Sequence, residues 1–288
     1  MLGIVNRLCK LTLLCCIFCS CLVASAQCKF TTLNIPGAID AAAEGVNDQG
    51  AIVGAVLDSQ GGRAFLLFQG KVTRFRFPGS SSTNASGINN HGQIVGDYTN
   101  GTSSKAGQFG FVVHNGVFQS ISAPSAPANT RALGINNLGA IVGSAGLDGF
   151  LLSSGHFTTI RFPGSTRTDA FGINDFGVIV GIYADARNFS HGFKLQSGKY
   201  TAIDFPGASN TGVTRIDNEG DMVGSYDVNG GDEHGFTLDK GRFLTQDDPN
   251  ASISTVIFGV NKFDRLVGTY VGAGGPNHAF TATCANVF

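Results

Sequence analysis

The stretch Gly172-Ile-Asn-Asp-Phe-Gly-Val-Ile-Val-Gly181 decides the fold of this chain. An Asn-x-x-Gly turn lies between two short apolar segments, which is the pattern of a β-hairpin. The Asn side chain can bond its own turn backbone, and the Gly can take a positive φ. The stretch therefore predicts two antiparallel strands joined by a fixed turn.

Five further copies of this stretch occur along the chain, three close and two degenerate. Their Asn or Asp landmarks lie at positions 47, 89, 136, 174, 217 and 261, which are 42, 47, 38, 43 and 44 residues apart. A period of about 40 to 50 residues is typical of four-stranded propeller blades. The fifth copy has Arg215 in place of the leading Gly, and the sixth has Asp264 in place of the turn Gly. Asp is one of the few residues that tolerate a positive φ.

Two further landmarks accompany the repeated stretch. A Phe-Pro-Gly element such as Phe162-Pro163-Gly164 precedes it, and a His-Gly-Phe element such as His191-Gly192-Phe193 follows it. Together these residues resemble the bacterial extracellular HAF-repeat proteins, over nearly the whole mature chain. The resemblance implies a propeller-like secreted protein and implies no catalytic residues.

The repeats predict an all-β fold, a six-bladed β-propeller of four-stranded antiparallel blades. In the fourth repeat the expected strands span 169–174, 178–183, 191–195 and 200–205. Small residues such as Ala170 and Gly172 place the first strand innermost, where blades crowd around an axis. A linear β-solenoid is the alternative, because repeats alone do not prove closure.

The two ends of the mature chain favour a closed ring. Phe30 to Ile35 matches the fourth strand of the other repeats, and the last repeat ends at its third strand, His278 to Thr283. The N-terminal strand would complete the sixth blade. Cys28 and Cys284 lie just outside these two strands, so we expect a disulfide that locks the ring. Residues 27–288 would then form one domain.

The first 26 residues have the features of a secretory signal peptide. Arg7 and Lys10 precede an apolar segment from Leu11 to Ala24, and Ala24-Ser25-Ala26 follows as a cleavage site. A membrane anchor would need about 20 apolar residues, and a lipoprotein would need a small residue where Gln27 stands. We expect a secreted, extracellular or periplasmic protein with no membrane insertion after cleavage.

The composition excludes some partners. The 19 basic and 20 acidic residues are balanced, which gives no electrostatic footprint for nucleic acid. Trp, the strongest sugar-stacking residue, is absent. We expect the binding partner to be a protein, a glycan or a small molecule that the sequence does not identify. We also expect the chain to be a monomer.

The fifth repeat holds the candidate binding residues. Arg215 and Asp217 replace Gly and Asn on the innermost strand. Residues that depart from a repeated structural pattern are often found at functional sites. A structural ion pair between these two residues is the alternative. The oxygen-rich loop between positions 227 and 233 adds four more candidates, which are Asp227, Asn229, Asp232 and Glu233.

We expect no cofactor, and calcium bound at this loop is the alternative. Oxygen side chains suit calcium, but the loop lacks the spacing of an EF-hand. His191, His234 and His278 recur at one position of three repeats and invite a metal hypothesis. Equivalent positions on neighbouring blades are too far apart for ligands of one ion, so we expect hydrogen bonds within each blade instead.

The sequence thus favours a secreted propeller that acts as a binding or interaction module. Nothing in it has the form of a nucleophile elbow, a metal-binding helix or a phosphate loop. One alternative is a propeller hydrolase or lyase, with its site around Arg215, Asp217 and the 227–233 loop. A purely structural envelope protein is another.

Overall fold

A computed structural model describes residues 27–101 and 107–285 of the chain. These residues form 24 β-strands and no helix, so none of them forms a helix that could span a membrane. The predicted signal peptide, residues 1–26, lies outside the described residues.

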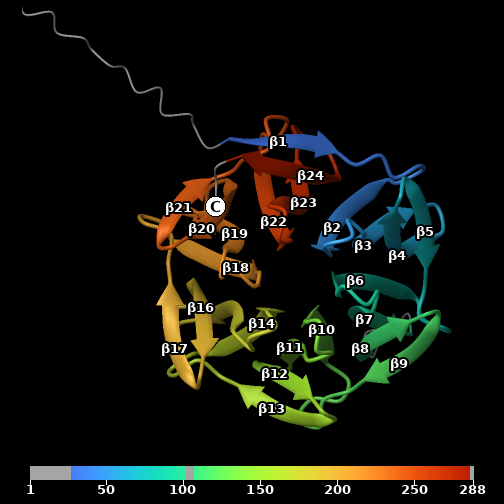
Figure 1. The fold of residues 1–288 in the computed structure, drawn as a ribbon, viewed down its shortest axis with the longest axis horizontal. Helices are drawn as coiled ribbons and strands as arrows, with labels where there is room; N and C mark the ends of the chain where they lie inside the picture. Colours follow the sequence, from blue (N-terminus) through green and yellow to red (C-terminus); the bar gives the residue numbers. More distant parts are fainter. Residues whose placement is uncertain (1–26, 102–106, 286–288) are drawn as a thin grey trace, which may run out of the picture.

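The strands form six four-stranded antiparallel blades around one axis (Figure 1). Blades 1 to 3 are β2 (Asp40–Val46), β3 (Ile52–Asp58), β4 (Gly61–Phe68), β5 (Lys71–Phe75); β6 (Ser82–Ile88), β7 (Ile94–Asn100), β8 (Gly107–His114), β9 (Val117–Ile121); and β10 (Thr130–Ile135), β11 (Ile141–Ala145), β12 (Asp148–Ser153), β13 (His156–Ile160). Blades 4 and 5 are β14 (Arg167–Ile173), β15 (Ile179–Ala184), β16 (Ser190–Gln196), β17 (Lys199–Ile203); and β18 (Asn210–Ile216), β19 (Met222–Asp227), β20 (Glu233–Asp239), β21 (Arg242–Thr245). Blade 6 is β22 (Ser254–Val260), β23 (Arg265–Val271), β24 (Asn277–Ala285) and β1 (Gln27–Thr32).

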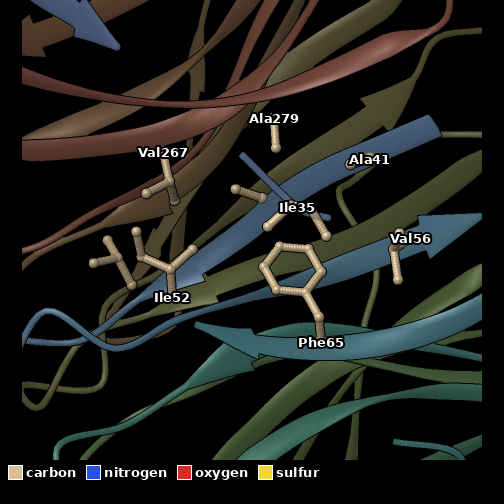
Figure 2. Packing of buried hydrophobic residues seen from close by; sticks show 9 residues of the cluster. Ile35, Ala41, Ile52, Val56, Phe65, Val267 and Ala279 are labelled. Carbon is tan, nitrogen blue, oxygen red and sulfur yellow. The ribbon is translucent and has the colours of Figure 1, made fainter. Parts of the chain in front are cut away.

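The ring closes as predicted, so the solenoid alternative is wrong. β1 pairs with β24 in a register that sets Cys28 opposite Cys284, and the two cysteines form a disulfide. Figure 2 shows the core across the closure, where Phe65 of blade 1 lies in one cluster with Val267 and Ala279 of blade 6. First and last blades therefore share buried apolar surface.

The repeated turn forms as the sequence predicts. In blade 1 the Asn47 Oδ1 atom accepts a hydrogen bond from the Ala51 N–H at 2.9 Å, and Gly50 has a φ of 79°. Asp264, which replaces the turn Gly in blade 6, has a φ of 55°. The turn joins first and second strands in every blade, so all six turns lie on one face of the ring, here named the turn face. The opposite face, which carries the loops before the first strand and after the second, is named the loop face.

Each inner strand carries a β-bulge at the same position. In blade 4 the register shifts between Ala170 and Gly172, which leaves Phe171 as the extra residue. Across from the bulge, a Cβ atom on Gly181 would lie 2.1 Å from the Asp169 carbonyl oxygen. The last Gly of the motif is therefore required by the bulge. The carbonyl of the extra residue is turned out of the ladder, and it faces the axis.

An aromatic stack between the Phe-Pro-Gly element and the second strand recurs in blades 2, 4 and 5, and a short His–Asp contact accompanies it in blades 4 and 5. Phe162, from the Phe-Pro-Gly element, stacks on Tyr183 with ring centroids 3.7 Å apart. The His191 ring stacks on the same Tyr, and its Nδ1 atom lies 2.8 Å from Asp204 Oδ1 within blade 4. His234 forms the same contact with Asp247. The expectation of hydrogen bonds within a blade is confirmed for these two histidines.

We predict that the disulfide contributes strongly to stability. It closes a loop with a sequence separation of 256, and in the chain-entropy model a loop of this length contributes up to about 5 kcal/mol. Cys284→Ala should lower the melting temperature by about 10 °C in a domain of this size. Calorimetry of the oxidised, reduced and variant proteins checks this, and three equal melting temperatures would contradict it.

Candidate functional site

One side chain occupies the axis of the propeller. The Arg215 guanidinium has five N–H donors, and each donates to a bulge carbonyl of a different blade. Nε donates to Phe258 at 3.2 Å, Nη1 to Leu133 and Phe171 at 3.2 and 2.9 Å, and Nη2 to Glu44 and Ser86 at 3.0 and 2.7 Å. Arg215 itself comes from blade 5, so this single side chain ties all six inner strands together.

Burial at the axis shifts two charged groups toward their neutral forms. Burial lowers the pKa of Arg215 to about 10, although the nearby Glu44 carboxylate opposes this shift. Burial also raises the pKa of Glu44 to about 7, against a hydrogen bond from Asn84. Among the described residues Arg215 forms no ion pair with Asp217, so the predicted ion pair between them is wrong.

Arg215 divides the channel into two cavities. On the turn face lies a polar cavity of about 130 Å³, here named the mouth, whose lining includes the turns of all six blades and Arg215. On the loop-face side of the guanidinium lies a cavity of about 160 Å³, lined by the bulge residues and Arg131. In the described part of the chain the Arg215 side chain therefore stands between the two cavities.

An inner ring of hydrogen bonds surrounds the mouth. In five blades the Asn of the repeated turn donates its side-chain amide to the carbonyl of the equivalent residue in the next blade. These bonds are Asn47 to Asn89, Asn89 to Asn136, Asn136 to Asn174, Asn174 to Asp217 and Asn261 to Asn47, at 2.9 to 3.1 Å. The ring lacks its sixth bond, from Asp217 to Asn261, because a carboxylate has no amide hydrogen.

An outer ring follows one residue later in each turn. Its members are Asp48, Asn90, Asn137, Asp175, Asn218 and Lys262. Asp175 accepts from both Asn137 and Asn218, whose side-chain nitrogens lie 2.8 Å from its Oδ2 atom. Burial alone would raise the pKa of Asp175, but these hydrogen bonds hold it below its ordinary value. The ring therefore presents fixed donors and acceptors at the mouth.

Exposed apolar side chains stand beside the polar mouth. Leu138 and Phe176 are each 77% exposed and Phe263 is 64% exposed, at the tips of the turns in blades 3, 4 and 6. These three residues are here named the crown. The crown therefore places exposed apolar surface on the face that carries the mouth.

The 227–233 loop lies away from this site, so the enzyme hypothesis that grouped it with Arg215 and Asp217 is wrong in that respect. Asp227 pairs with Asn210 at the start of β18, whereas Asp217 follows the end of that strand. Seven residues of strand separate them, or about 20 Å. Arg215 and Asp217 line the mouth, while Asp227, Asn229, Asp232 and Glu233 lie on the loop face.

The loop residues are engaged in local hydrogen bonds. Asp227 accepts from Asn210 and from the Gly230 N–H, and Glu233 accepts from Ser225. In the part of the chain that the structure describes, no group of three His, Cys, Asp or Glu side chains could hold a metal ion. Calcium binding at the loop stays a prediction.

The sequence interpretation missed the outer ring and the crown. A polar or charged residue follows the Asn or Asp landmark in all six copies, which is a signal that could have revealed the outer ring. The crown has no such regularity, because its position holds Gln49, His91 and Glu219 in the other three blades.

Comparison with solved structures supports the fold and no more. The chain is similar to a protein of unknown function from Dyadobacter fermentans, with a TM-score of 0.58 and 9% identity over 89% of this chain and 97% of that one. It is also similar to the Aleuria aurantia lectin in complex with α-methyl-L-fucoside, with a TM-score of 0.50, 11% identity and the same two coverages. TolB from Acinetobacter baumannii matches with a TM-score of 0.50 and 9% identity, over 88% of this chain and 66% of TolB. No protein-family model and no curated protein sequence matches the chain.

We predict that Arg215→Met destabilises the protein strongly. The change leaves five carbonyls without their donors, and water entering the channel would replace them only in part. Unsatisfied buried groups of this kind cost about 1 to 3 kcal/mol each when taken singly, so we expect a loss of about 3 to 5 kcal/mol in total. Urea unfolding measures it. Arg187→Met, at an exposed arginine, is the control with a change within about 0.5 kcal/mol, and an equally small change at Arg215 would contradict the prediction.

We predict that stability falls as pH rises through the range where Asp217 ionises. Burial raises the pKa of Asp217 from 3.8 to about 6, so the folded state favours its protonated form. The contribution of protonated Asp217 to stability is therefore fully present below about pH 4, falls as the pH rises, and is lost above about pH 6. Asp217→Asn should remove this part of the loss and supply the sixth ring bond, so it should raise stability at pH 7.5 by ~2 kcal/mol and change it little at pH 4. Melting temperatures against pH check this, and parallel curves for parent and variant would contradict it.

Proposed function

We propose that this protein is an exported binding module whose ligand site is the mouth on the turn face. The observation that carries the proposal is the pair of hydrogen-bonded rings around the mouth. A ring of side chains that hold one another in place is preorganised, so it loses little conformational entropy when a ligand binds. The Cys28–Cys284 disulfide supports export, because disulfides persist in oxidising compartments.

We propose a sugar as the ligand. Carboxamides and carboxylates in fixed positions suit hydroxyl groups, which both donate and accept hydrogen bonds. The crown supplies apolar surface that a sugar ring can cover with its C–H face, so Phe176 and Phe263 take the role that Trp often has. The similarity in fold to the Aleuria aurantia lectin, whose structure contains a fucoside, is consistent with this class of ligand.

Hydrolysis of a sugar at the same mouth is the second candidate function. The observation that favours it is Asp217, whose pKa burial raises to about 6 while Asp175 is held ionised by its donors. A protonated and an ionised carboxyl are the two groups that glycoside hydrolysis uses. The same binding experiment separates the two functions, because only an enzyme would release new reducing ends.

We predict that the mature chain binds a member of a glycan array, and that Asp175→Ala weakens this binding at least tenfold. Asp175 orients two neighbouring amides, so its loss disorders the outer ring. Asp227→Ala, on the loop face, is the matched control and should bind as the parent does. Melting temperatures confirm that both variants fold. No bound glycan, or equal weakening by both variants, would overturn the proposal.

A further inference from the structure

We propose that the mouth selects a sugar with a free ammonium group, which binds in a slot between blades 5 and 6 formed by Asp217 and the Asn261 carbonyl. This inference rests on the proposed sugar-binding function and names the chemical class of the sugar. It is carried by a break that both hydrogen-bonded rings share at this one junction.

The inner ring lacks a donor at the slot. Elsewhere in the ring a turn carbonyl accepts two hydrogen bonds, as Asn47 does from the Gly50 N–H and from the Asn261 amide. The Asn261 carbonyl accepts from the Asp264 N–H at 3.0 Å and, among the described hydrogen bonds, from no other donor. The side chain of blade 5 in the ring is Asp217, whose Oδ1 atom accepts from the Gly220 and Asp221 N–H groups at 2.9 Å, which leaves Oδ2 in the place of the amide nitrogen of the other blades. Asp217 is only 9% exposed, and both it and Asn261 line the mouth, so this junction has two acceptors where the other five have a donor and an acceptor.

The outer ring is open at the same junction. Asn218 of blade 5 directs its amide away from the slot, to Asp175 in blade 4 at 2.8 Å. Lys262 of blade 6 lies on the other side, with its Nζ atom 3.7 Å from Asp48 of blade 1. Among the described hydrogen bonds and ion pairs, none joins Asn218 to Lys262. Both rings are therefore interrupted at the junction between blades 5 and 6, and this junction is the proposed slot.

When Asp217 is ionised, the slot favours a donor that carries positive charge. An ammonium group has three N–H donors and no acceptor, so it can bond the Asp217 carboxylate and the Asn261 carbonyl together. Its charge makes the bond to the carboxylate stronger than a bond from a neutral hydroxyl. An acetylated amine keeps one N–H but loses the charge, so the slot should discriminate against it.

The charges around the slot favour a cation. The lining of the mouth holds four carboxyl groups and two cations, which are Asp48, Asp175, Asp217 and Glu219 against Lys262 and Arg215. Lys262 is beside Asp48, and the five Arg215 donors are all taken by carbonyls. Behind the slot, Asp264 follows Lys262, and Asp221 lies in an acidic group with Asp239 that Lys240 partly offsets.

A proton competes with the ammonium group for the slot. When Asp217 is protonated, its O–H can donate to the Asn261 carbonyl and complete the inner ring. Burial raises the pKa of Asp217 to about 6. Burial and the nearby Asp217 raise the pKa of Asp221 to about 7, so its protonation also reduces the negative charge near the slot as the pH falls. Ammonium binding should therefore weaken as pH falls below about 6.

The test compares three sugars that share one ring. Glucosamine, glucose and N-acetylglucosamine are titrated into the mature chain by calorimetry at pH 7.5, in phosphate buffer because amine buffers would compete. We expect glucosamine to bind at least tenfold more tightly than the other two, and this ratio to fall toward one at pH 5. In Asp217→Asn, whose own amide fills the slot, the ratio should be near one at both pH values. Asp227→Asn, which removes one negative charge on the loop face, should keep the parent ratio.

Each outcome separates this inference from the function on which it rests. If the three sugars bind equally to the parent, the ammonium slot is wrong and sugar binding stands. If none binds, the ammonium slot is wrong, and the glycan array decides whether the proposed sugar-binding function stands. If glucosamine is preferred but Asp217→Asn keeps the preference, the ammonium group binds elsewhere and the slot is wrong. Should the variant fail to fold, the pH dependence of the parent ratio decides, and a ratio unchanged between pH 7.5 and pH 5 would overturn the inference.

Discussion

Five hydrogen bonds from the Arg215 guanidinium join the six blades of this propeller at its axis. In each of the five blades other than blade 5, the inner strand carries a bulge whose carbonyl is directed at the guanidinium on the axis. Five carbonyl oxygens directed at one axis would repel one another and lack donors. Arg215 satisfies all five with its full set of N–H groups, and the charge of a guanidinium suits a ring of partial negative charges.

Limited space at the axis explains both the glycines of the other copies and the arginine of the fifth copy. A Cβ atom on Gly134 would lie 2.5 Å from the Phe171 carbonyl oxygen and 3.0 Å from Arg215 Nη1. A side chain in that blade would therefore displace the guanidinium that completes the ring. One arginine and five glycines fit around the axis, so the exception in repeat 5 and the regularity of the other repeats are parts of one arrangement.

The sequence allowed the fold to be predicted in detail because its signals are local and repeated. The turn motif fixes a hairpin, its period fixes the blade, and the positions of Cys28 and Cys284 fix the closure. The same reasoning singled out Arg215 and Asp217 as departures, yet it gave Arg215 the wrong partner. The bulge carbonyls belong to residues as different as Glu44, Leu133 and Phe258, so no side-chain pattern marks them. The 227–233 loop was joined to the mouth because sequence proximity hides the length of the strand between them.

The engagement of Arg215 also decides what Asp217 can do. The two residues alternate along the end of one strand, so both face the channel, and a free guanidinium there would pair with the carboxylate next to it. All five donors are instead bound to carbonyls, and the guanidinium has none left for a carboxylate. Among the described residues Asp217 therefore forms no ion pair with Arg215, and it lies at the junction where both rings are open. Because the bulge carbonyls bind all the Arg215 donors, the Asp217 carboxyl is available to a ligand at the mouth. Selection of a ligand by its charge requires such a group.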